Sequence, residues 1–193
     1  MERKTPLYQT HVDAGGKIVE FGGFLMPVQY PTGVLAEHMA VRQKAGLFDV
    51  SHMGELRLKG PDAVANVQKL ITADISTMQD GDIKYAMFCN DAGGILDDFI
   101  VYRCAADDYW LVVNAGNRDK DAAWVESHLF GDVDYRDEGD DWGQVALQGP
   151  KSGDILKKLC AEQYIPAKYY TFIDNVPLDL GSRTIHALVS QTG

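Results

Sequence analysis

The chain has 193 residues, of which 46% are hydrophobic and 24% charged, and its formal net charge at neutral pH is −10. This composition is ordinary for a globular protein, and the negative charge disfavours nucleic-acid binding. No apolar run of about 18 residues or signal-peptide core is present, so we expect neither a membrane span nor secretion. Cys89, Cys104 and Cys160 are odd in number and widely spaced, which predicts small buried residues rather than a disulfide frame or zinc site.

The first 71 residues alternate between helical and strand patterns. Thr5 followed by Pro6 is typical of a helix start, because threonine caps free N–H groups and proline suits the first turn. The pair Gly22 and Gly23 interrupts an apolar segment and predicts a bend. The predicted elements are a helix over 5–12, strand and loop over 17–30, a helix over 34–45, a strand over 55–59 and a helix over 60–71 with Val64, Val67 and Leu70 buried.

Three strand-like segments separated by short turns then predict an antiparallel meander, over 84–90, 95–102 and 109–114. Gly93 and Gly94 supply the first turn, because glycine tolerates positive φ. The remaining predicted elements are a helix over 117–129 with Ala122, Ala123, Val125 and Leu129 buried, an edge strand over 132–137, an acidic linker over 138–141, a strand over 142–148, a helix over 149–160 and strands over 168–173 and 185–190. Strands paired by short turns, with helices between the groups, predict an α+β fold with mostly antiparallel sheets and flanking helices.

Two adjacent carboxylates, Asp97 and Asp98, lie inside the middle strand of the meander. Because side chains alternate faces, Asp98 shares a face with Ile100 and Tyr102, and Asp97 points to the other face. Both faces are mostly apolar, which predicts a central strand covered on both sides. Asp97 is nearer the turn and suits a structural role of accepting backbone N–H groups. Asp98 is predicted to lie deeper, which makes it the better candidate for a site acid.

Further side chains are candidates for a ligand slot. Tyr85 and Tyr102, with Asn114 on the third strand, are either core residues or the polar tips of a slot for a flat heterocycle. Met53 either fills the core or lines that slot, since its sulfur packs well against rings. His52 is expected to hydrogen-bond to backbone. No Walker loop, HExxH, GxSxG or CxxC motif is present, so the sequence predicts no nucleotide or metal site.

Eight short stretches, in the same order along the whole chain, resemble the aminomethyltransferase (T-protein) family of the glycine cleavage system. They are residues 5–8 (TPLY), 21–27 (FGGFLMP), 40–42 (AVR), 48–54 (FDVSHMG), 93–98 (GGILDD), 113–115 (VNA), 148–150 (QGP) and 189–193 (VSQTG). Phe24 stands where the family usually has Trp, and Gln191 where it usually has Arg. The likeness covers the family's N-terminal part, so we expect a truncated form of the folate-binding aminomethyltransferase fold.

The resemblance implies a tetrahydrofolate-dependent enzyme. Members of the family take an aminomethyl group from the lipoyl arm of the H-protein, release ammonia and pass the one-carbon unit to tetrahydrofolate. The resemblance also implies that Asp98 is the catalytic acid. The implied folate contacts are Met53, Tyr85, Ile100, Tyr102, Asn114, Tyr169 and Tyr170. The expected partner is the lipoylated H-protein, with no metal, nucleic acid or membrane, in the cytoplasm or, for a eukaryotic source, the mitochondrial matrix.

Two alternatives stay open at this point. One is a folate-dependent demethylase of the same fold, or the folate domain of a dimethylglycine- or sarcosine-oxidising enzyme. The other is a folate-binding accessory protein that has lost catalysis. In either case we expect residues 1–50 and 140–193 to form a discontinuous first domain, residues 51–139 to form an inserted domain with the central sheet, and the family's C-terminal domain to be absent.

We predict that the isolated 193-residue chain has no aminomethyltransferase activity, because it covers only the N-terminal part of the family. The measurement is ammonia release from aminomethyl-lipoyl H-protein in the presence of tetrahydrofolate. Aminomethyltransferase activity in the purified 193-residue chain would contradict this expectation.

Overall fold

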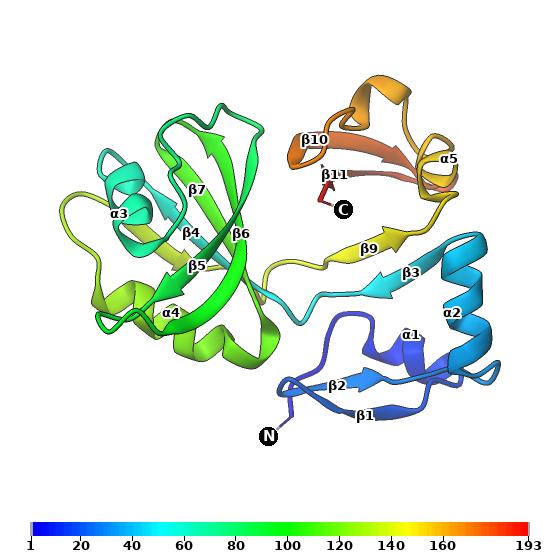
Figure 1. Ribbon diagram of the computed structural model, residues 1–193. Coiled ribbons are helices and arrows are strands. Elements are labelled where there is room, and N and C mark those ends of the chain that lie inside the picture. The colour runs from blue at the N-terminus through cyan, green and yellow to red at the C-terminus, as the bar shows by residue number, and fades with distance from the viewer. Residues whose placement is uncertain (1, 193) are drawn as a thin grey trace.

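The largest sheet of the molecule has five antiparallel strands, and its longest strand, β6 (Ile95–Ala105), lies between β5 and β7 (Figure 1). In this computed structural model, which describes residues 2–192, the strand order is β5-β6-β7-β4-β8. The other four strands are β4 (Gly54–Lys59), β5 (Ile83–Cys89), β7 (Asp108–Val113) and β8 (Asp134–Asp137). The predicted meander and the predicted edge strand are therefore confirmed.

Three two-stranded antiparallel sheets make up the rest of the β-structure. They pair β1 (Ile18–Phe21) with β2 (Phe24–Pro27), β3 (Gly46–Asp49) with β9 (Val145–Gln148), and β10 (Thr171–Asp179) with β11 (Thr184–Gln191). The helices are α1 (Tyr8–Asp13), α2 (Val34–Gln43), α3 (Ala63–Leu70), α4 (Arg118–Ser127) and α5 (Ser152–Leu156), with short 3₁₀ turns η1 (Ala115–Asn117) and η2 (Glu162–Tyr164). The α+β class with antiparallel sheets is as the sequence predicts.

One face of the five-stranded sheet carries the main hydrophobic core. Helices α3 and α4 cover this face (Figure 1), and alternate residues of every central strand point into it. The largest fully buried side chains there are Leu56, Leu58, Val67, Ile75, Phe88, Val101, Tyr109, Leu111, Val113 and Val125. Each large apolar side chain buried in this way stabilises the fold by about 1.5–3 kcal/mol.

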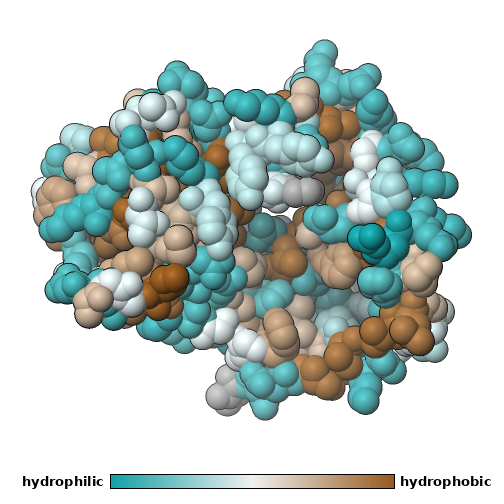
Figure 2. Space-filling view, viewed as in Figure 1, coloured by the Kyte–Doolittle hydropathy of each residue, from teal (hydrophilic) through white to brown (hydrophobic). Residues whose placement is uncertain are grey.

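The opposite face of the sheet, here called the second face, packs against the β10–β11 hairpin. Ile83, Tyr102, Trp110 and Val112 form a smaller buried cluster with Phe172 of β10. The Ile83 N–H donates to the Tyr170 carbonyl at 2.8 Å, and the Phe172 N–H donates to the Gly81 carbonyl at 2.8 Å. These bonds attach the hairpin to the start of β5, and the space-filling view is hollowed beside this junction (Figure 2).

The N-terminal segment differs from the sequence prediction in two respects. Helix α1 begins at Tyr8, because the Thr5 hydroxyl donates to the Asp49 carboxylate at 2.7 Å and does not cap the helix. Residues 46–49 form a strand that the sequence did not predict, and they pair with β9. Both differences come from long-range partners, which a local pattern cannot contain.

The buried faces of the helices also correct the predicted core. On α3 the buried residues are Ala63, Asn66, Val67 and Leu70, which follow helical spacing, and Val64 is exposed. On α4, Ala123 is exposed, because that helix buries Arg118, Asp121 and Val125 toward the sheet.

Other predictions also change in extent. Helix α5 ends at Leu156 rather than Cys160, and the cysteines, all unpaired, are only partly buried. Strand β6 is central, but its second face stays open to solvent at Asp98.

The predicted domain division stays a prediction, although the topology agrees with it. Every strand of the five-stranded sheet comes from residues 54–137, and β3 and β9 lie side by side where the chain enters and leaves that region (Figure 1).

We predict that Leu58→Ala lowers the free energy of unfolding by about 2–5 kcal/mol, because Leu58 is 0% exposed and its loss leaves a cavity. Leu35→Ala is the matched control, since Leu35 is 83% exposed and its loss changes stability by less than about 0.5 kcal/mol. Denaturant unfolding measures both, and equal effects would contradict the placement of the core.

Candidate functional site

Strand alternation and register bring the predicted site residues from three strands to the second face. Tyr85 on β5 lies opposite Ile100 on β6, and Ile100 lies opposite Val112 on β7. Asp98 is two residues before Ile100 and so continues the same face. Asn114 directly follows the end of β7, and its side chain lies beside the Asp97–Asp98 segment of β6. The two acids point to opposite faces, as the sequence predicts: Asp98 lies on the open second face, and Asp97 lies on the core face.

Asp98 is exposed and has one side-chain partner among the described residues. The Tyr85 hydroxyl donates to Asp98 Oδ2 at 2.6 Å, and the Tyr85 side chain is itself 50% exposed. This hydrogen bond, with a smaller contribution from burial, raises the pKa of Tyr85 above its ordinary value, because the carboxylate favours the neutral phenol. The expectation that Asp98 lies deep in the strand is wrong; its carboxylate is accessible to a ligand.

Asn114 connects the two acids. Its Nδ2 donates both to Asp97 Oδ1 at 3.0 Å and to the Asp98 carbonyl oxygen at 2.7 Å. Its backbone N–H donates to Asp97 Oδ2 at 3.3 Å, and Asn117 Nδ2 adds a bond to Asp97 Oδ1 at 2.7 Å. Asn114 is therefore held by a buried carboxylate directly behind the strand that presents Asp98.

Asp97 is 6% exposed, and its carboxylate is well supplied with donors. Burial alone would raise the pKa of Asp97, but the neighbouring Asp121 carboxyl and the hydrogen bonds from Asn114 and Asn117 outweigh it and lower the pKa below its ordinary value. Such bonding to the charged form keeps a buried carboxylate ionised. The predicted structural role for Asp97 agrees with this geometry.

Met53, Ile100 and Tyr102 lie together in the cluster of the second face. The Tyr102 hydroxyl donates to Ser190 Oγ of β11 at 3.3 Å, and the Tyr102 ring lies 5.2 Å from the Phe172 ring. These contacts form an apolar wall next to the exposed polar groups of Asp98 and Tyr85. A wall of this kind with few polar groups is the ordinary lining of a site for a flat organic ligand.

Tyr169 and Tyr170 precede β10 and are both exposed. They line a cavity of about 170 Å³ with Ile83, Lys84 and Lys168, and Tyr170 adopts a positive φ of 58°. Tyr170 is close enough to Tyr85 to add slightly to the rise in its pKa. The structure thus places both tyrosines at the border of the second face, beside the hairpin attachment.

His52 does not behave as predicted. Its Nδ1 is buried without a hydrogen-bond partner among residues 2–192, and its ring contacts Phe21 and Phe24 edge-on. Burial lowers the pKa of His52, against the attraction of Asp49. His52 therefore belongs to an aromatic cluster and is not tied to backbone through Nδ1.

Two buried acids near the site were not singled out from the sequence. Burial raises the pKa of Glu55 to about 8 against the opposing charge of Arg118, and Glu55 shares the second face with Val112. On α4, burial followed by the influence of the Asp97 carboxylate raises the pKa of Asp121 to about 8. The position of Asp121 three residues after Arg118 is its only sequence signal, since that spacing places both on one helix face.

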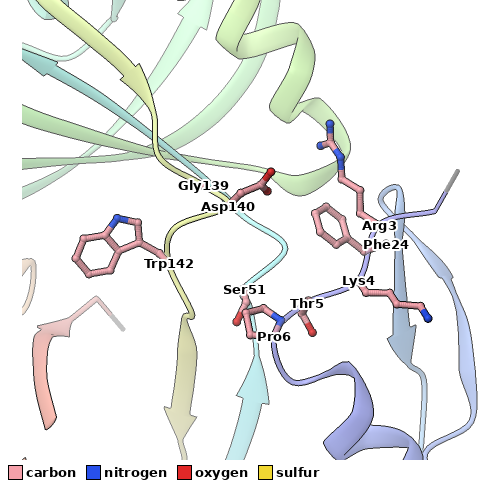
Figure 3. A pocket seen from close by; sticks show the side chains of 9 residues that line it. All are labelled: Arg3, Lys4, Thr5, Pro6, Phe24, Ser51, Gly139, Asp140 and Trp142. Carbon is pink, nitrogen blue, oxygen red and sulfur yellow. The ribbon is translucent and has the colours of Figure 1, made fainter.

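A larger cavity, of about 430 Å³, has a different lining, although its Trp142 also packs against the cluster of the second face. Figure 3 shows its lining: Arg3, Lys4, Thr5, Pro6, Phe24, Ser51, Gly139, Asp140 and Trp142. Among the described residues this lining includes none of the predicted folate contacts, and the Arg3 guanidinium is already paired with Asp119 at 2.8 Å. The second face, which carries the accessible carboxylate and the apolar wall, remains the better candidate site on chemical grounds.

Comparison with known proteins places the chain in a family. Residues 7–193 match the family model described as the GCVT N-terminal domain, so the chain belongs to that family. The chain is 49% identical over 187 residues to an aminomethyltransferase from Desulfitobacterium hafniense, with 94% of this chain and 51% of the relative covered. It is 44% identical over 193 residues to an aminomethyltransferase from Bacillus licheniformis, with 100% and 52% covered. The chain therefore spans about half the length of these curated relatives.

A solved structure agrees with the fold. The glycine cleavage system aminomethyltransferase T from Bartonella henselae matches with a TM-score of 0.81 and 35% sequence identity, covering 90% of this chain and 48% of that one. The expected aminomethyltransferase-like fold is confirmed by this likeness.

Two further features of the described residues bear on cofactors and membranes. Between residues 2 and 192, no helix combines the length and the apolar character that crossing a membrane requires. Over the same residues, no group of three or more histidine, cysteine, aspartate or glutamate side chains is arranged to hold a metal ion.

We predict that Asp98→Asn lowers the pKa of Tyr85 toward its ordinary value, because the neutral amide no longer stabilises the phenol as the carboxylate does. A pH titration of the Tyr85 ring resonances by NMR measures this shift. Asp91→Asn is the control, since that exposed turn acid is not among the groups that act on Tyr85. An unchanged Tyr85 titration in Asp98→Asn would show that the two side chains are not paired in solution.

Proposed function

We propose that the full-length protein is the tetrahydrofolate-dependent aminomethyltransferase of the glycine cleavage system. It takes the aminomethyl group carried on the lipoyl arm of the H-protein, releases ammonia and delivers the carbon to tetrahydrofolate as the 5,10-methylene derivative. The carbon loses its bonds to sulfur and to the departing nitrogen and gains bonds to two folate nitrogens. Family membership and the names of the relatives support the reaction class.

The observation that carries this proposal is the accessible Asp98 carboxylate beside an apolar wall. A pterin ring is flat and apolar on its faces and polar at its edge, which suits Met53 and Ile100 with the neighbouring polar groups. A carboxylate at Asp98 would orient the folate nitrogen and stabilise the positive charge that develops as the iminium-like carbon transfers. Tyr85 would hold that carboxylate in place through its hydroxyl.

The remaining proposed folate contacts surround this centre. Tyr102 and Asn114 would supply hydrogen-bonding groups from β6 and β7, and Tyr169 and Tyr170 would close the slot from the hairpin side. Because the chain is strongly acidic, with a net charge of −10, we assign to it the pterin end of the folate rather than the anionic glutamate tail. The bacterial relatives favour the cytoplasm as the place where the enzyme meets the H-protein.

We predict that Asp98→Asn lowers kcat/KM by about 10²–10⁴-fold, the usual contribution of a positioned acid or base. The assay is ammonia release from aminomethyl-lipoyl H-protein with tetrahydrofolate, using the full-length protein. Asp98 is exposed, so the same change shifts the free energy of unfolding by less than about 0.5 kcal/mol.

Asp91→Asn serves as the charge-matched control in this assay and is expected to leave kcat/KM unchanged. Full turnover in Asp98→Asn would show that Asp98 is not the catalytic acid. Intact tetrahydrofolate binding without ammonia release in the wild type would instead favour a folate-binding accessory protein.

A further inference from the structure

Asp121 is a buried acid that the proposed chemistry does not use. It lies on α4, is 0% exposed, and neither of its carboxyl oxygens accepts an N–H or O–H donor from residues 2–192. The Lys120 ammonium donates to the Leu96 carbonyl at 2.6 Å and stays 3.7 Å from Asp121 Oδ1, which is longer than a hydrogen bond. An ionised carboxylate in this position would be buried without a donor, which is costly.

The carboxyl group that neighbours Asp121 is Asp97. Asp121 lies one helical turn after Asn117, whose Nδ2 donates to Asp97 Oδ1, so the buried Asp121 carboxyl is on the helix side that faces Asp97. Two neighbouring buried acids cannot both be ionised cheaply, so one of them holds a proton. Asp97 accepts three N–H groups, from the Asn114 backbone, Asn114 Nδ2 and Asn117 Nδ2, and these favour its charged form. Asp121 has none of these donors, so the proton is more stable on Asp121 than on Asp97.

We propose that Asp121 is a positioning residue for the site: as a neutral carboxyl it donates a hydrogen bond to Asp97 and so holds the Asn114 amide against the Asp98 backbone. This inference rests on the proposed function, because it takes Asp98 and Asn114 as members of the folate site. The path from Asp121 to Asp98 is short, because one atom, Asn114 Nδ2, donates both to Asp97 Oδ1 and to the Asp98 carbonyl.

Loss of the Asp121 proton would disturb this arrangement. Two negative charges would then face each other, and the Asp97 carboxylate would move or bind a proton, either of which releases its bonds to Asn114. The charged groups that face Asp121 are Asp97 from β6 and Lys120 from its own helix. Asn114 and Asn117 are neutral, and the Tyr135 hydroxyl of β8 is bonded to the Ala122 carbonyl. Since the pKa of Asp121 lies near 8, the bonds between Asp97 and Asn114 are lost at alkaline pH.

The test compares Asp121→Asn, Asp121→Leu and the control Glu126→Gln, which removes an exposed acid from the same helix. Tetrahydrofolate affinity and kcat/KM of the full-length protein are measured across the pH range from about 6 to 9.5. In the wild type both fall above about pH 8, approaching tenfold per pH unit for one proton. Asp121→Asn keeps an N–H donor that does not ionise, so this alkaline fall disappears while activity at pH 7 is retained. Asp121→Leu removes the donor and lowers kcat/KM by about tenfold or more at pH 7, where the wild-type Asp121 holds its proton.

A purely structural role for Asp121 would lower stability in both variants without moving the alkaline limb. An alkaline limb unchanged in Asp121→Asn, or wild-type kcat/KM in a folded Asp121→Leu, overturns the proposal. Carboxyl ¹³C resonances of the wild type report the shared proton without folate: Asp121 should titrate near pH 8, and ordinary titration of both acids below pH 5 overturns the pairing. Absence of tetrahydrofolate binding at every pH, with the Asp121 titration still near 8, would instead show that the proposed function has failed while the pair exists.

Discussion

The three N–H groups that converge on the buried carboxylate of Asp97 are the interaction on which the site depends. They come from Asn114 and Asn117, the first and last residues of the connection from β7 to α4, so one carboxylate fixes that connection against β6. Hydrogen bonds to a charged group contribute about 1.5–3 kcal/mol each, whereas a buried charge without partners is strongly destabilising. Their joint effect is a rigid backing for the strand that presents Asp98, which matters because a site acid must be held in one orientation to act.

The two faces of the five-stranded sheet have different roles. The face under α3 and α4 is dry and filled with large apolar side chains, and it carries most of the stability. The second face is only partly covered by the β10–β11 hairpin, so Tyr85 and Asp98 remain accessible beside an apolar wall. A side chain on the second face can therefore meet a ligand without a large cost to the fold. The two adjacent acids illustrate this division, since Asp97 is buried and hydrogen-bonded and Asp98 is exposed.

The electrostatics of the site follow from burial more than from net charge. Although the chain carries ten more negative than positive formal charges, Asp97 is stabilised as an anion, while Asp121 and Glu55 are held toward their neutral forms. Neutral carboxyls act as hydrogen-bond donors, which ionised ones cannot. In the proposed pairing, aspartate thus serves as the acceptor at Asp97 and as the donor at Asp121.

Local patterns in the sequence determined the α+β class, the β5–β6–β7 meander, the edge strand β8 and the opposite orientation of Asp97 and Asp98, because these depend on short turns and on alternation along a strand. The order of short stretches along the chain also led to the family that the comparisons confirm. What only the tertiary structure decided are the features that need partners distant in sequence. Thr5 bonds Asp49 in place of capping a helix, β3 pairs with β9 across about 100 residues, and α4 turns Asp121 rather than Ala123 toward the sheet. Asp98 is exposed although its strand is apolar, because what covers a strand face is supplied by another segment of the chain and not by the strand itself.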